Sequence, residues 1–413
     1  MVGGGRAAPG APRPHDVPVR VALVSEVWTP EVDGLVTRLE RTVAQLRRAG
    51  HDVLVVAPTT GTDLPGVQER RTRGVRIPFL YGGRRWGVPD LRVPRAVREF
   101  APDVVHVVNP VLMGVAAARW VAPRLPLVVS YHTDVATYAG HYHLGAFEGF
   151  VHASMRSTYR RADVRLATSP VGRGHLAGIG VEDVDLWGRG VDTGAFRPDR
   201  DGARLRARLG PDPDLAVAMH VGRIASEKGC DRLVPLAAGD PPVQLALVGE
   251  GPDRARLERV LAGERAAFTG VLRGDDLADA YAAADVLVFS SETDTLGLVL
   301  LEAMASGLPV VALDTSTARQ TLDGYEAARF VPGGAGEGAW NVLVRAASEA
   351  AARSAEAHGG GAAGRVAARA AVARPAADWA LTTEHLVEDV YARAVELAGA
   401  RLAGSRRRTA GAL

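Results

Sequence analysis

Short apolar runs rich in β-branched residues recur along the chain, with stretches of helical periodicity between them. Five runs in the first half have the length of strands buried on both faces of a sheet: Val19–Ser25, Val53–Ala57, Val104–Val108, Leu127–Tyr131 and Val164–Ala167. After the first run, apolar residues recur at three- and four-residue steps from Leu35, and Gly50 ends the pattern. Alternating strands and helices predict a parallel α/β sheet.

The second half repeats this alternation after a polar, turn-rich segment at Phe196–Gly202. Its predicted strands are Leu215–Val221, Val243–Val248, Val286–Phe289 and Pro309–Leu313. The pattern therefore predicts two open α/β sheets in series. Ligands of such sheets bind beyond the carboxyl ends of the strands, so we expect the facing loops of both halves to define one cleft.

These boundaries predict two domains, residues 19–198 and 199–378, preceded by a flexible tail at 1–18. A helix at 379–400 and a basic tail at 401–413 complete the chain. The residues expected on the apolar side of that helix are Leu381, Leu386, Val390 and Val395. The Ala- and Gly-rich stretch Gly333–Gly364 is compatible with helices and loops and carries no chemical signal.

Composition narrows the class of protein. The 413 residues are 47% hydrophobic, which excludes a disordered chain. The 49 basic and 47 acidic side chains nearly cancel, so we expect no nucleic-acid partner. Cys230 has no second cysteine to pair with, and no apolar run reaches the ~20 residues of a membrane span. We expect a cytoplasmic protein, with peripheral contact at the inner membrane face as an alternative.

The basic side chains are almost all arginine, and Lys228 is the exception. It lies in VGRIASEKG, directly after a predicted strand, with Gly222 and Arg223 at the strand end. Two cations five residues apart at this edge suit a diphosphate, whose departing charge they would stabilise. The alternative is a pair of surface cations without a ligand.

A second candidate site is the segment SSETDTLGLVLLEAMA. Gly297 precedes a predicted helix, and the free amides of Leu298 and Val299 at its start are candidate donors to an anion. Asp294 lies on the loop before the helix, and Glu302 lies about one turn into it, where it can accept hydrogen bonds from hydroxyl groups. The alternative for this acidic pair is surface charge.

The segment SYHTD holds a third candidate, His132, at the end of a predicted strand. A histidine there is either a hydrogen-bonded structural residue or a catalytic one. Asp134 is either a helix cap or an acceptor-orienting residue.

Together these segments resemble the retaining glycosyltransferases of family four, which have the two-Rossmann GT-B fold. Further matching stretches are PEVDGLVT, LWGRGVDTGAFRP, LVGEGP and FTGVLRGDDLADAYAAADV, and the resemblance runs in order from Val19 to Val331. Members similar to this chain add mannosyl, glucosyl or sulfoquinovosyl units. The resemblance implies transfer of a hexosyl unit, with retention, from GDP-mannose or a UDP-hexose to a hydroxyl of a lipid or small-molecule acceptor. It also implies that no cofactor and no metal is required.

The resemblance implies roles for the matching residues. Catalytic roles fall on His132, Arg223, Lys228 and Asp294. Donor-binding roles fall on Gly34, Gly222, Leu272, Arg273, Gly297, Leu298, Val299 and Glu302. Acceptor contacts fall on Asp134 and Tyr138. The domain at 19–198 would then hold the acceptor, the domain at 199–378 would hold the nucleotide sugar, and the helix at 379–400 would cross back to the first domain.

The chain departs from the family pattern at two places. Asp294 stands where the family most often has the longer Glu, which changes its reach toward the sugar. Asp314, Thr315 and Ser316 replace the paired glycines that often follow the strand at Val310, on the donor-sugar side of the pocket.

Five other classes of protein share single features with this sequence. LVGEGP lacks the third glycine of a dinucleotide fingerprint, because Arg254 occupies that position. A pyridoxal-phosphate enzyme would need Lys228 for its Schiff base. The Asp-x-Asp pairs of a metal-dependent transferase, Asp183/Asp185 and Asp212/Asp214, lie in turn-like sequence. A sugar-nucleotide epimerase and a non-catalytic sugar-nucleotide-binding protein stay as alternatives.

Overall fold

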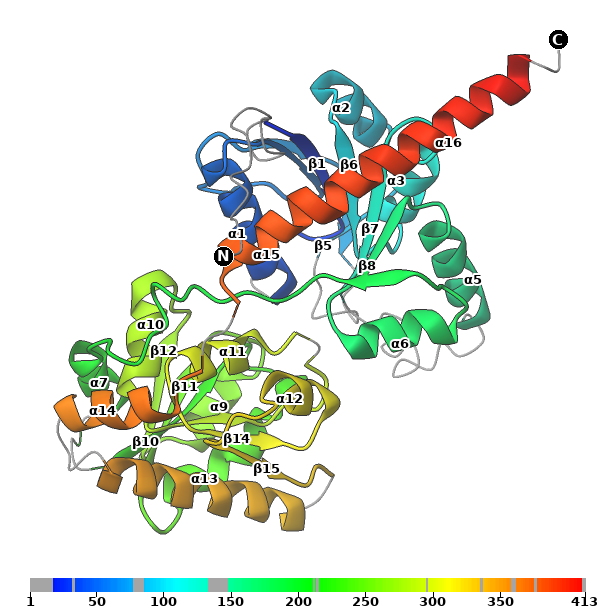
Figure 1. Cartoon of the computed structure of the whole chain (residues 1–413). Coiled ribbons are helices and arrows are strands. Elements are labelled where there is room, and N and C mark those ends of the chain that lie inside the picture. The colour runs from blue at the N-terminus through cyan, green and yellow to red at the C-terminus, as the bar shows by residue number, and fades with distance from the viewer. Residues whose placement is uncertain are drawn as a thin grey trace, which may run out of the picture. The chain divides into compact units, whose positions relative to one another are not determined.

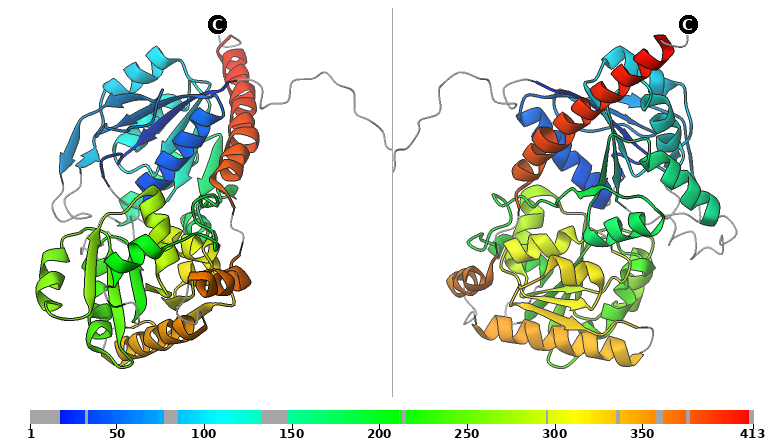
Figure 2. Two further views of the ribbon diagram at one scale, coloured as in Figure 1. Left: turned by 90° about the vertical axis from the view of Figure 1, so that its left-hand side faces the viewer. Right: turned by 45° about the vertical axis from the view of Figure 1, so that its right-hand side comes forward.

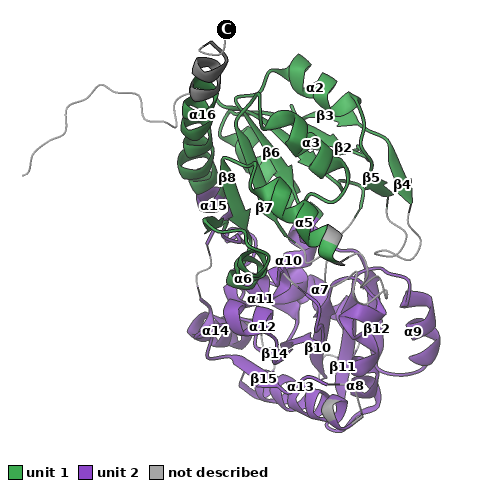
Figure 3. Ribbon diagram, turned by 90° about the vertical axis from the view of Figure 1, so that its right-hand side faces the viewer, with its two compact units in different colours: residues 1–32, 36–187, 383–413 green, residues 33–35, 188–382 purple. Residues whose placement is uncertain are grey.

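The computed structural model describes residues 18–31, 34–76, 85–132, 148–210, 212, 215–294, 296–334, 337–357, 362–374 and 377–410. The chain forms two compact units (Figure 3). The first unit comprises Met1–Val32, Val36–Trp187 and Thr383–Leu413, and the second comprises Asp33–Leu35 and Gly188–Thr382. Both units are built on a parallel sheet with helices, as the alternating pattern predicts (Figure 1).

The sheet of the first unit has seven strands in the order β3-β2-β1-β6-β7-β8-β9, and every neighbouring pair is parallel. These strands are β1 (Arg20–Ser25), β2 (Asp52–Ala57), β3 (Gln68–Arg71), β6 (Val104–Val108), β7 (Leu127–Tyr131), β8 (Val164–Ala167) and β9 (Val184–Leu186). The helices of this part are α1 (Gly34–Arg48), α2 (Arg92–Phe100), α3 (Met113–Val121), α5 (Glu148–Tyr159) and α6 (Pro170–Gly178). A small antiparallel pair joins β4 (Gly74–Arg76) to β5 (Arg85–Gly87).

The sheet of the second unit has six parallel strands in the order β12-β11-β10-β13-β14-β15. They are β10 (Ala216–Val221), β11 (Val243–Val248), β12 (Ala266–Gly270), β13 (Val286–Phe289), β14 (Val310–Leu313) and β15 (Ala328–Val331). The α-helices are α7 (Ala203–Leu209), α8 (Val234–Ala238), α9 (Arg254–Val260), α10 (Gly274–Ala283), α11 (Leu298–Ala305), α12 (Ser316–Thr321), α13 (Glu337–Ala357) and α14 (Ala362–Val372).

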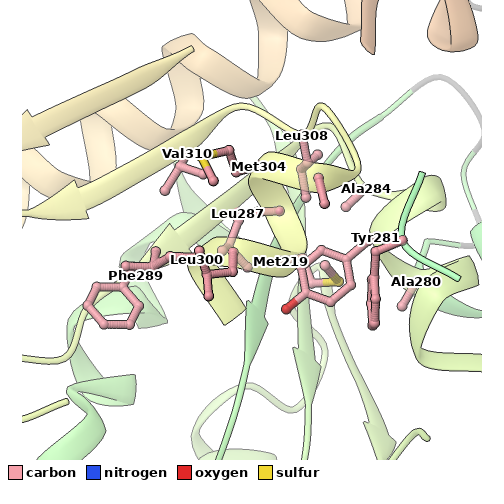
Figure 4. Close-up of a cluster of buried hydrophobic side chains, with 14 of the residues drawn as sticks. Met219, Ala280, Tyr281, Ala284, Leu287, Phe289, Leu300, Met304, Leu308 and Val310 are labelled. Atoms are coloured by element: carbon pink, nitrogen blue, oxygen red, sulfur yellow. The ribbon is translucent and has the colours of Figure 1, made fainter. Parts of the chain in front are cut away.

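Side chains of the second sheet alternate between two apolar cores. Met219, Leu287 and Val310 pack with Leu300 and Tyr281 in one core (Figure 4). The strand residues that alternate with them pack with α13 and α8 in the other core. Because the strands are covered on both faces, they are continuous apolar runs, and this is why the sequence reveals them.

The last helical stretch consists of α15 (Trp379–His385), a π-helical segment (Leu386–Tyr391) and α16 (Ala392–Ala410). From Thr383 onward it belongs to the first unit, and α16 runs alongside the sheet of that unit (Figure 2). Arg401 of α16 is ion-paired there with Asp163 at 2.9 Å. This confirms a terminal helix that returns to the first domain. None of the helices within the described ranges is both long and apolar enough to span a membrane.

Two residues expected on the apolar side of this helix are exposed instead. Leu381 and Val395 are 62% and 43% exposed, whereas Leu386 and Val390 are buried as predicted. The buried face also contains Trp379, Thr382, Thr383, Val387, Tyr391, Ala394 and Ala398. These positions follow steps of three and four residues from Trp379, and Leu381 falls between those steps. Val395 continues the steps, four residues after Tyr391, and is exposed nevertheless.

Candidate functional site

The strand order of the second unit identifies one crevice in its sheet. Chain order runs outward from β10 through β11 to β12, and then restarts on the other side of β10 with β13. Ligands of such sheets bind beyond the carboxyl ends of the strands where the order reverses. The loops that follow β10 and β13 contain Arg223, Lys228, Asp294 and Gly297, which are four of the predicted site residues.

The end of β10 lies against the end of β11 through backbone atoms. Gly222 N–H donates to Val248 O at 3.0 Å. A Cβ atom at Gly249, whose φ is +146°, would lie 1.8 Å from Gly222 O. Only glycine is compatible with this approach. It fixes the path of the chain from Gly222 into the loop that holds Arg223 and Lys228.

Each of the two predicted cations has an acidic partner. Lys228 Nζ lies 2.7 Å from Asp294 Oδ2, and both side chains are partly exposed. Arg223 Nη1 lies 2.8 Å from Glu227 Oε1. The structure thus brings Lys228 and Asp294 together, and it adds Glu227, which the sequence motifs did not single out.

Asp294 also organises the loop before α11. Its Oδ1 accepts hydrogen bonds from the backbone N–H groups of Leu296 (3.1 Å) and Gly297 (2.9 Å). Its own carbonyl oxygen accepts a hydrogen bond from Thr317 Oγ1 at 2.7 Å. Arg189 supports the same loop, because it donates to Leu296 O and, at 2.8 Å, to Thr321 Oγ1. The carboxylate therefore holds both Lys228 and the entry to the helix.

Gly297 is the N-cap of α11 and has a φ of +57°. The left-handed conformation turns the chain so that Leu298 and Val299 begin the helix. The first amides of a helix have no carbonyl partner within it, and the helix dipole favours negative charge at that end. The residues predicted to donate to an anion thus lie in the geometry that this role requires.

Glu302 lies one turn into α11 and is partly buried. Tyr281 of α10 donates from its hydroxyl to Glu302 Oε2 at 2.7 Å and is itself fully buried. Tyr281 packs edge-to-face against Phe196 with 5.3 Å between ring centroids. The tyrosine therefore fixes one carboxylate oxygen of Glu302 from the core side. Tyr281 lies in the matching stretch FTGVLRGDDLADAYAAADV, but the sequence alone did not pair it with Glu302.

The remaining second-unit residues lie on neighbouring loops. Leu272 and Arg273 follow β12, where Leu272 is partly buried against the core and Arg273 is exposed as the N-cap of α10. After β14, Thr315 caps α12 by accepting a hydrogen bond from Ala318 N–H at 3.2 Å. Asp314 forms a two-pronged ion pair with Arg319: Nε donates to Oδ1 at 2.7 Å and Nη2 donates to Oδ2 at 2.8 Å. The residues that replace the family's glycines thus form a capped helix start.

Charge and burial shift the pKa values of this site. Burial raises the pKa of Asp294, but Lys228 and the amides of Gly297 and Leu296 lower it by more, so the net pKa is below its usual value. Burial, with a contribution from Lys228, lowers the pKa of His220 to about 4. The site is therefore an ion pair beside a neutral histidine at neutral pH.

His132 lies in the first unit, directly after β7, and is 2% exposed. Its Nε2 lies 2.8 Å from Ser130 Oγ, and its backbone N–H donates to Asn109 Oδ1 at 3.2 Å. Burial, together with the charge of Arg38, lowers the pKa of His132 well below its usual value. Its ring is edge-on to Trp187, with 5.4 Å between centroids.

The remaining predictions concern Gly34, the two expected acceptor residues and the Asp-x-Asp pairs. Gly34 is the first residue of α1, and a Cβ atom there would lie 3.2 Å from Leu296 Cδ1. Asp134 and Tyr138 lie outside the described residues. Of the Asp-x-Asp pairs, Asp185 is ion-paired with Arg393. Within the described ranges, no group of three or more His, Cys, Asp or Glu side chains could hold a metal ion.

Family models match both halves of the chain. The model described as "Glycosyltransferase Family 4" matches residues 32–195, and the model described as "Glycosyl transferases group 1" matches residues 216–348. A GDP-mannose-dependent alpha-mannosyltransferase of Mycobacterium tuberculosis is 39% identical over 329 residues, which cover 76% of this chain and 84% of that protein.

Two further similarities concern a second relative and a solved structure. A GDP-mannose-dependent alpha-(1-6)-phosphatidylinositol dimannoside mannosyltransferase of M. tuberculosis is 29% identical over 318 residues, covering 74% of this chain and 82% of that protein. The structure of sucrose-phosphate synthase from Thermosynechococcus elongatus matches with a TM-score of 0.68 at 20% identity, covering 89% of this chain and 97% of that one. The chain therefore belongs to glycosyltransferase family 4 and is a retaining hexosyltransferase of the GT-B fold with a nucleotide-sugar donor.

Proposed function

We propose that the chain transfers a mannosyl unit from GDP-mannose to a hydroxyl group of a lipid acceptor. The 39% identity to a GDP-mannose-dependent mannosyltransferase, spread over three quarters of the chain, carries the proposed donor. The phosphatidylinositol dimannoside in the name of the second relative supports a lipid acceptor. We assign the acceptor to the domain at 19–198 and the donor to the domain at 199–378.

The donor would bind at the crevice between β10 and β13. A diphosphate needs positive charge around it. Arg223, Lys228 and the first amides of α11 would supply that charge. The Lys228 ammonium donates to Asp294 Oδ2, which holds this positive charge at the place where the diphosphate would bind. Glu302 would accept hydrogen bonds from the ribose hydroxyls, and Leu272 and Arg273 would border the base.

In the transfer step the bond between the anomeric carbon and the β-phosphate oxygen breaks, and a bond from the acceptor oxygen to the same carbon forms on the same face. The acceptor proton passes to the departing phosphate oxygen, and GDP leaves. The anomeric carbon gains oxocarbenium character as negative charge collects on the phosphate. Lys228, Arg223 and the α11 amides stabilise that charge where it develops. No bound metal is assigned a role in this step.

The test is a transfer assay with purified protein, GDP-mannose labelled in the sugar, a mixture of phosphoinositide and other glycerolipid acceptors, and EDTA. We expect label to enter the organic phase and GDP to be released in equal amount. A parallel assay uses UDP-glucose labelled in the sugar. Transfer of label from UDP-glucose, with none from GDP-mannose, would overturn the proposed donor. Interconversion of sugar nucleotides without release of GDP would favour an epimerase.

Two variants sharpen the assay. Lys228→Ala should lose transfer, because it removes the diphosphate cation. Arg256→Ala is the matched control, since Arg256 lies in the same unit and pairs at the surface with Asp231 at 2.7 Å. Transfer by Lys228→Ala at the rate of Arg256→Ala would remove the proposed diphosphate site.

A further inference from the structure

A buried chain of hydrogen bonds runs through the first unit and ends at His132. Tyr391 OH lies 2.9 Å from His106 Nδ1, and His106 Nε2 lies 2.8 Å from Ser130 Oγ. Ser130 Oγ lies 2.8 Å from His132 Nε2. All four residues are at most 2% exposed. The chain thus links the terminal helical stretch, through β6 and β7, to the predicted catalytic histidine.

The ring of Trp187 packs beside both histidines. Its centroid lies 5.3 Å from that of His106 and 5.4 Å from that of His132. The guanidinium of Arg38 stacks over the Trp187 ring, with its Cζ 4.0 Å from the ring centroid, and Arg38 Nη2 donates to Trp187 O at 2.9 Å. This fixed positive charge, together with burial, keeps both imidazoles neutral. Each ring therefore has one N–H donor and one bare nitrogen acceptor.

The single hydroxyl proton of Ser130 makes the direction of the chain an either-or choice. Ser130 contacts Nε2 of both histidines, so it donates to one of these nitrogens and accepts from the other. If Ser130 donates to His132, then His106 carries its proton on Nε2 and accepts from Tyr391 at Nδ1. Every hydroxyl and ring proton of the chain then has a partner among the described residues, except the proton that His132 carries on Nδ1.

The opposite direction leaves two buried groups without a partner among the described residues. His106 Nδ1 would then donate to Tyr391 OH, and the Tyr391 proton would need a second acceptor. In the part of the chain that the structure describes, Tyr391 OH has the contact with His106 and no other hydrogen bond. His132 Nδ1 would in addition be a buried acceptor without a donor. The first direction leaves one such group, the Nδ1–H of His132, and is therefore the more stable one.

We propose that Tyr391, His106 and Ser130 are positioning residues that fix the tautomer of His132, so that its Nδ1–H is a hydrogen-bond donor to an oxygen of the bound sugar. His132 Nδ1 is buried and has no partner among the described residues, as a donor reserved for a ligand requires. The proposal rests on the proposed transferase function for its ligand, but the tautomer itself does not.

This assignment also gives His132 a defined chemical role. Its bare nitrogen, Nε2, is occupied by the Ser130 hydroxyl, so His132 is not available as a general base. The chain ends at the buried Tyr391, so it offers no route by which a proton could leave. The residues therefore orient a neutral donor and do not relay protons, which agrees with a departing phosphate that takes the acceptor proton.

The experiment is ¹⁵N NMR of the full-length protein labelled in its histidine rings, with His132→Gln and His106→Gln spectra to assign the two signals. At pH 7.5 we expect protonated Nδ1 on His132 and protonated Nε2 on His106, which are opposite tautomers. A His132 that carries its proton on Nε2 overturns the inference, whether or not the protein transfers mannose. The expected tautomers in a protein that transfers no sugar would uphold the chain and overturn the proposed function instead.

Tyr391→Phe tests the origin of the direction. It removes the terminal donor without changing the ring, so the tautomer preference of His106 should weaken and kcat for transfer should fall about tenfold. Tyr159→Phe is the matched control, because Tyr159 is also buried in the first unit and its hydroxyl has no hydrogen-bond partner among the described residues. Unchanged histidine signals in Tyr391→Phe would contradict the proposed role of Tyr391.

Discussion

The two units have sheets of the same strand order up to the sixth strand, yet the residues gathered at their strand ends differ in kind. After β10 and β13, the second unit holds the partly exposed ion pair of Lys228 and Asp294 beside a helix N-terminus. In the first unit, a fully buried chain of neutral groups includes His106 of β6 and Ser130 of β7 and ends at His132, directly after β7.

This difference follows from access to water. Charged groups are costly to bury unless they are paired, so Lys228 and Arg223 stay partly exposed and each has an acidic partner. Neutral imidazole and hydroxyl groups can be buried when each hydrogen bond is made. We therefore propose that one topology supports an anion site built on charge in one unit and a hydrogen-bond donor of fixed tautomer in the other, because function resides in the site and not in the fold.

Loss of the lysine charge is the strongest way to break this comparison. Lys228→Ala should lower kcat/KM for transfer about 10²–10³-fold, the usual effect of removing one donor that stabilises transition-state charge. Thermal stability should fall only by what the ion pair with Asp294 contributes, because the side chain is partly exposed and lies outside the apolar cores. Steady-state kinetics against Arg256→Ala measures the effect. A loss below threefold would contradict a charge-based site.

A substitution at the backbone contact between the ends of β10 and β11 should have the next largest effect, here on the stability of the fold. Gly249→Ala places a methyl group against Gly222 O, so we expect a loss of more than about 3 kcal/mol of stability, or failure to fold. Gly263→Ala is the control, since Gly263 also has a positive φ but a Cβ there meets no atom within 4 Å. Its cost should stay near 1 kcal/mol. Equal denaturant midpoints for the two variants would contradict this account.

Asp294→Asn separates the loop-holding role of this residue from its charge. The amide oxygen can still accept from Leu296 and Gly297, whereas the ion pair with Lys228 is lost, so we expect roughly tenfold slower transfer. Transfer at the wild-type rate would show that the carboxylate's charge is dispensable.

The same substitution makes a prediction about pH. The pKa of Asp294 is lowered in the folded protein, so its contribution to stability is present above the unfolded pKa of about 3.9 and is lost as pH falls through the lower folded value. When the pH is lowered from 6 to 3.5, the melting temperature of the wild type should therefore fall further than that of Asp294→Asn. An equal loss in both proteins would contradict the ion-pair assignment.

The smallest predicted effects concern Glu302 and its neighbour. Glu302→Gln should weaken GDP binding about tenfold, because a hydrogen bond to a charged acceptor is exchanged for a neutral one. Tyr281→Phe removes the contact that orients the carboxylate and should weaken binding about threefold. Calorimetric titration with GDP measures both. A larger effect from Tyr281→Phe than from Glu302→Gln would contradict the proposed ribose contact.

Most of the sheet framework could be predicted from the sequence, because strands buried on both faces are continuous apolar runs. The strands from Val104 and Val243 begin and end at the predicted residues. The runs that were missed are short, polar or at sheet edges, such as β3 with its sequence QERR. An edge strand gains its structure from one neighbour, so its own side chains carry little signal.

The site was only partly predictable, for a different reason. Motifs place Lys228 and Asp294 on two loops, and parallel topology brings those loops to one edge of the sheet. Glu227 and Tyr281 lie within matching stretches, but the stretches do not say which side chains these two residues contact, and Tyr391 lies outside all of the stretches. Tyr391 is 285 positions from His106, a distance over which periodicity gives no information.

The most direct test of the central claim is calorimetric titration of the metal-free wild type, Lys228→Ala and Arg256→Ala with GDP and UDP. The account predicts that GDP binds the wild type and Arg256→Ala with equal affinity, that it binds Lys228→Ala at least about tenfold more weakly, and that UDP binds more weakly than GDP. Equal GDP affinity in all three proteins would contradict a diphosphate site built around Lys228.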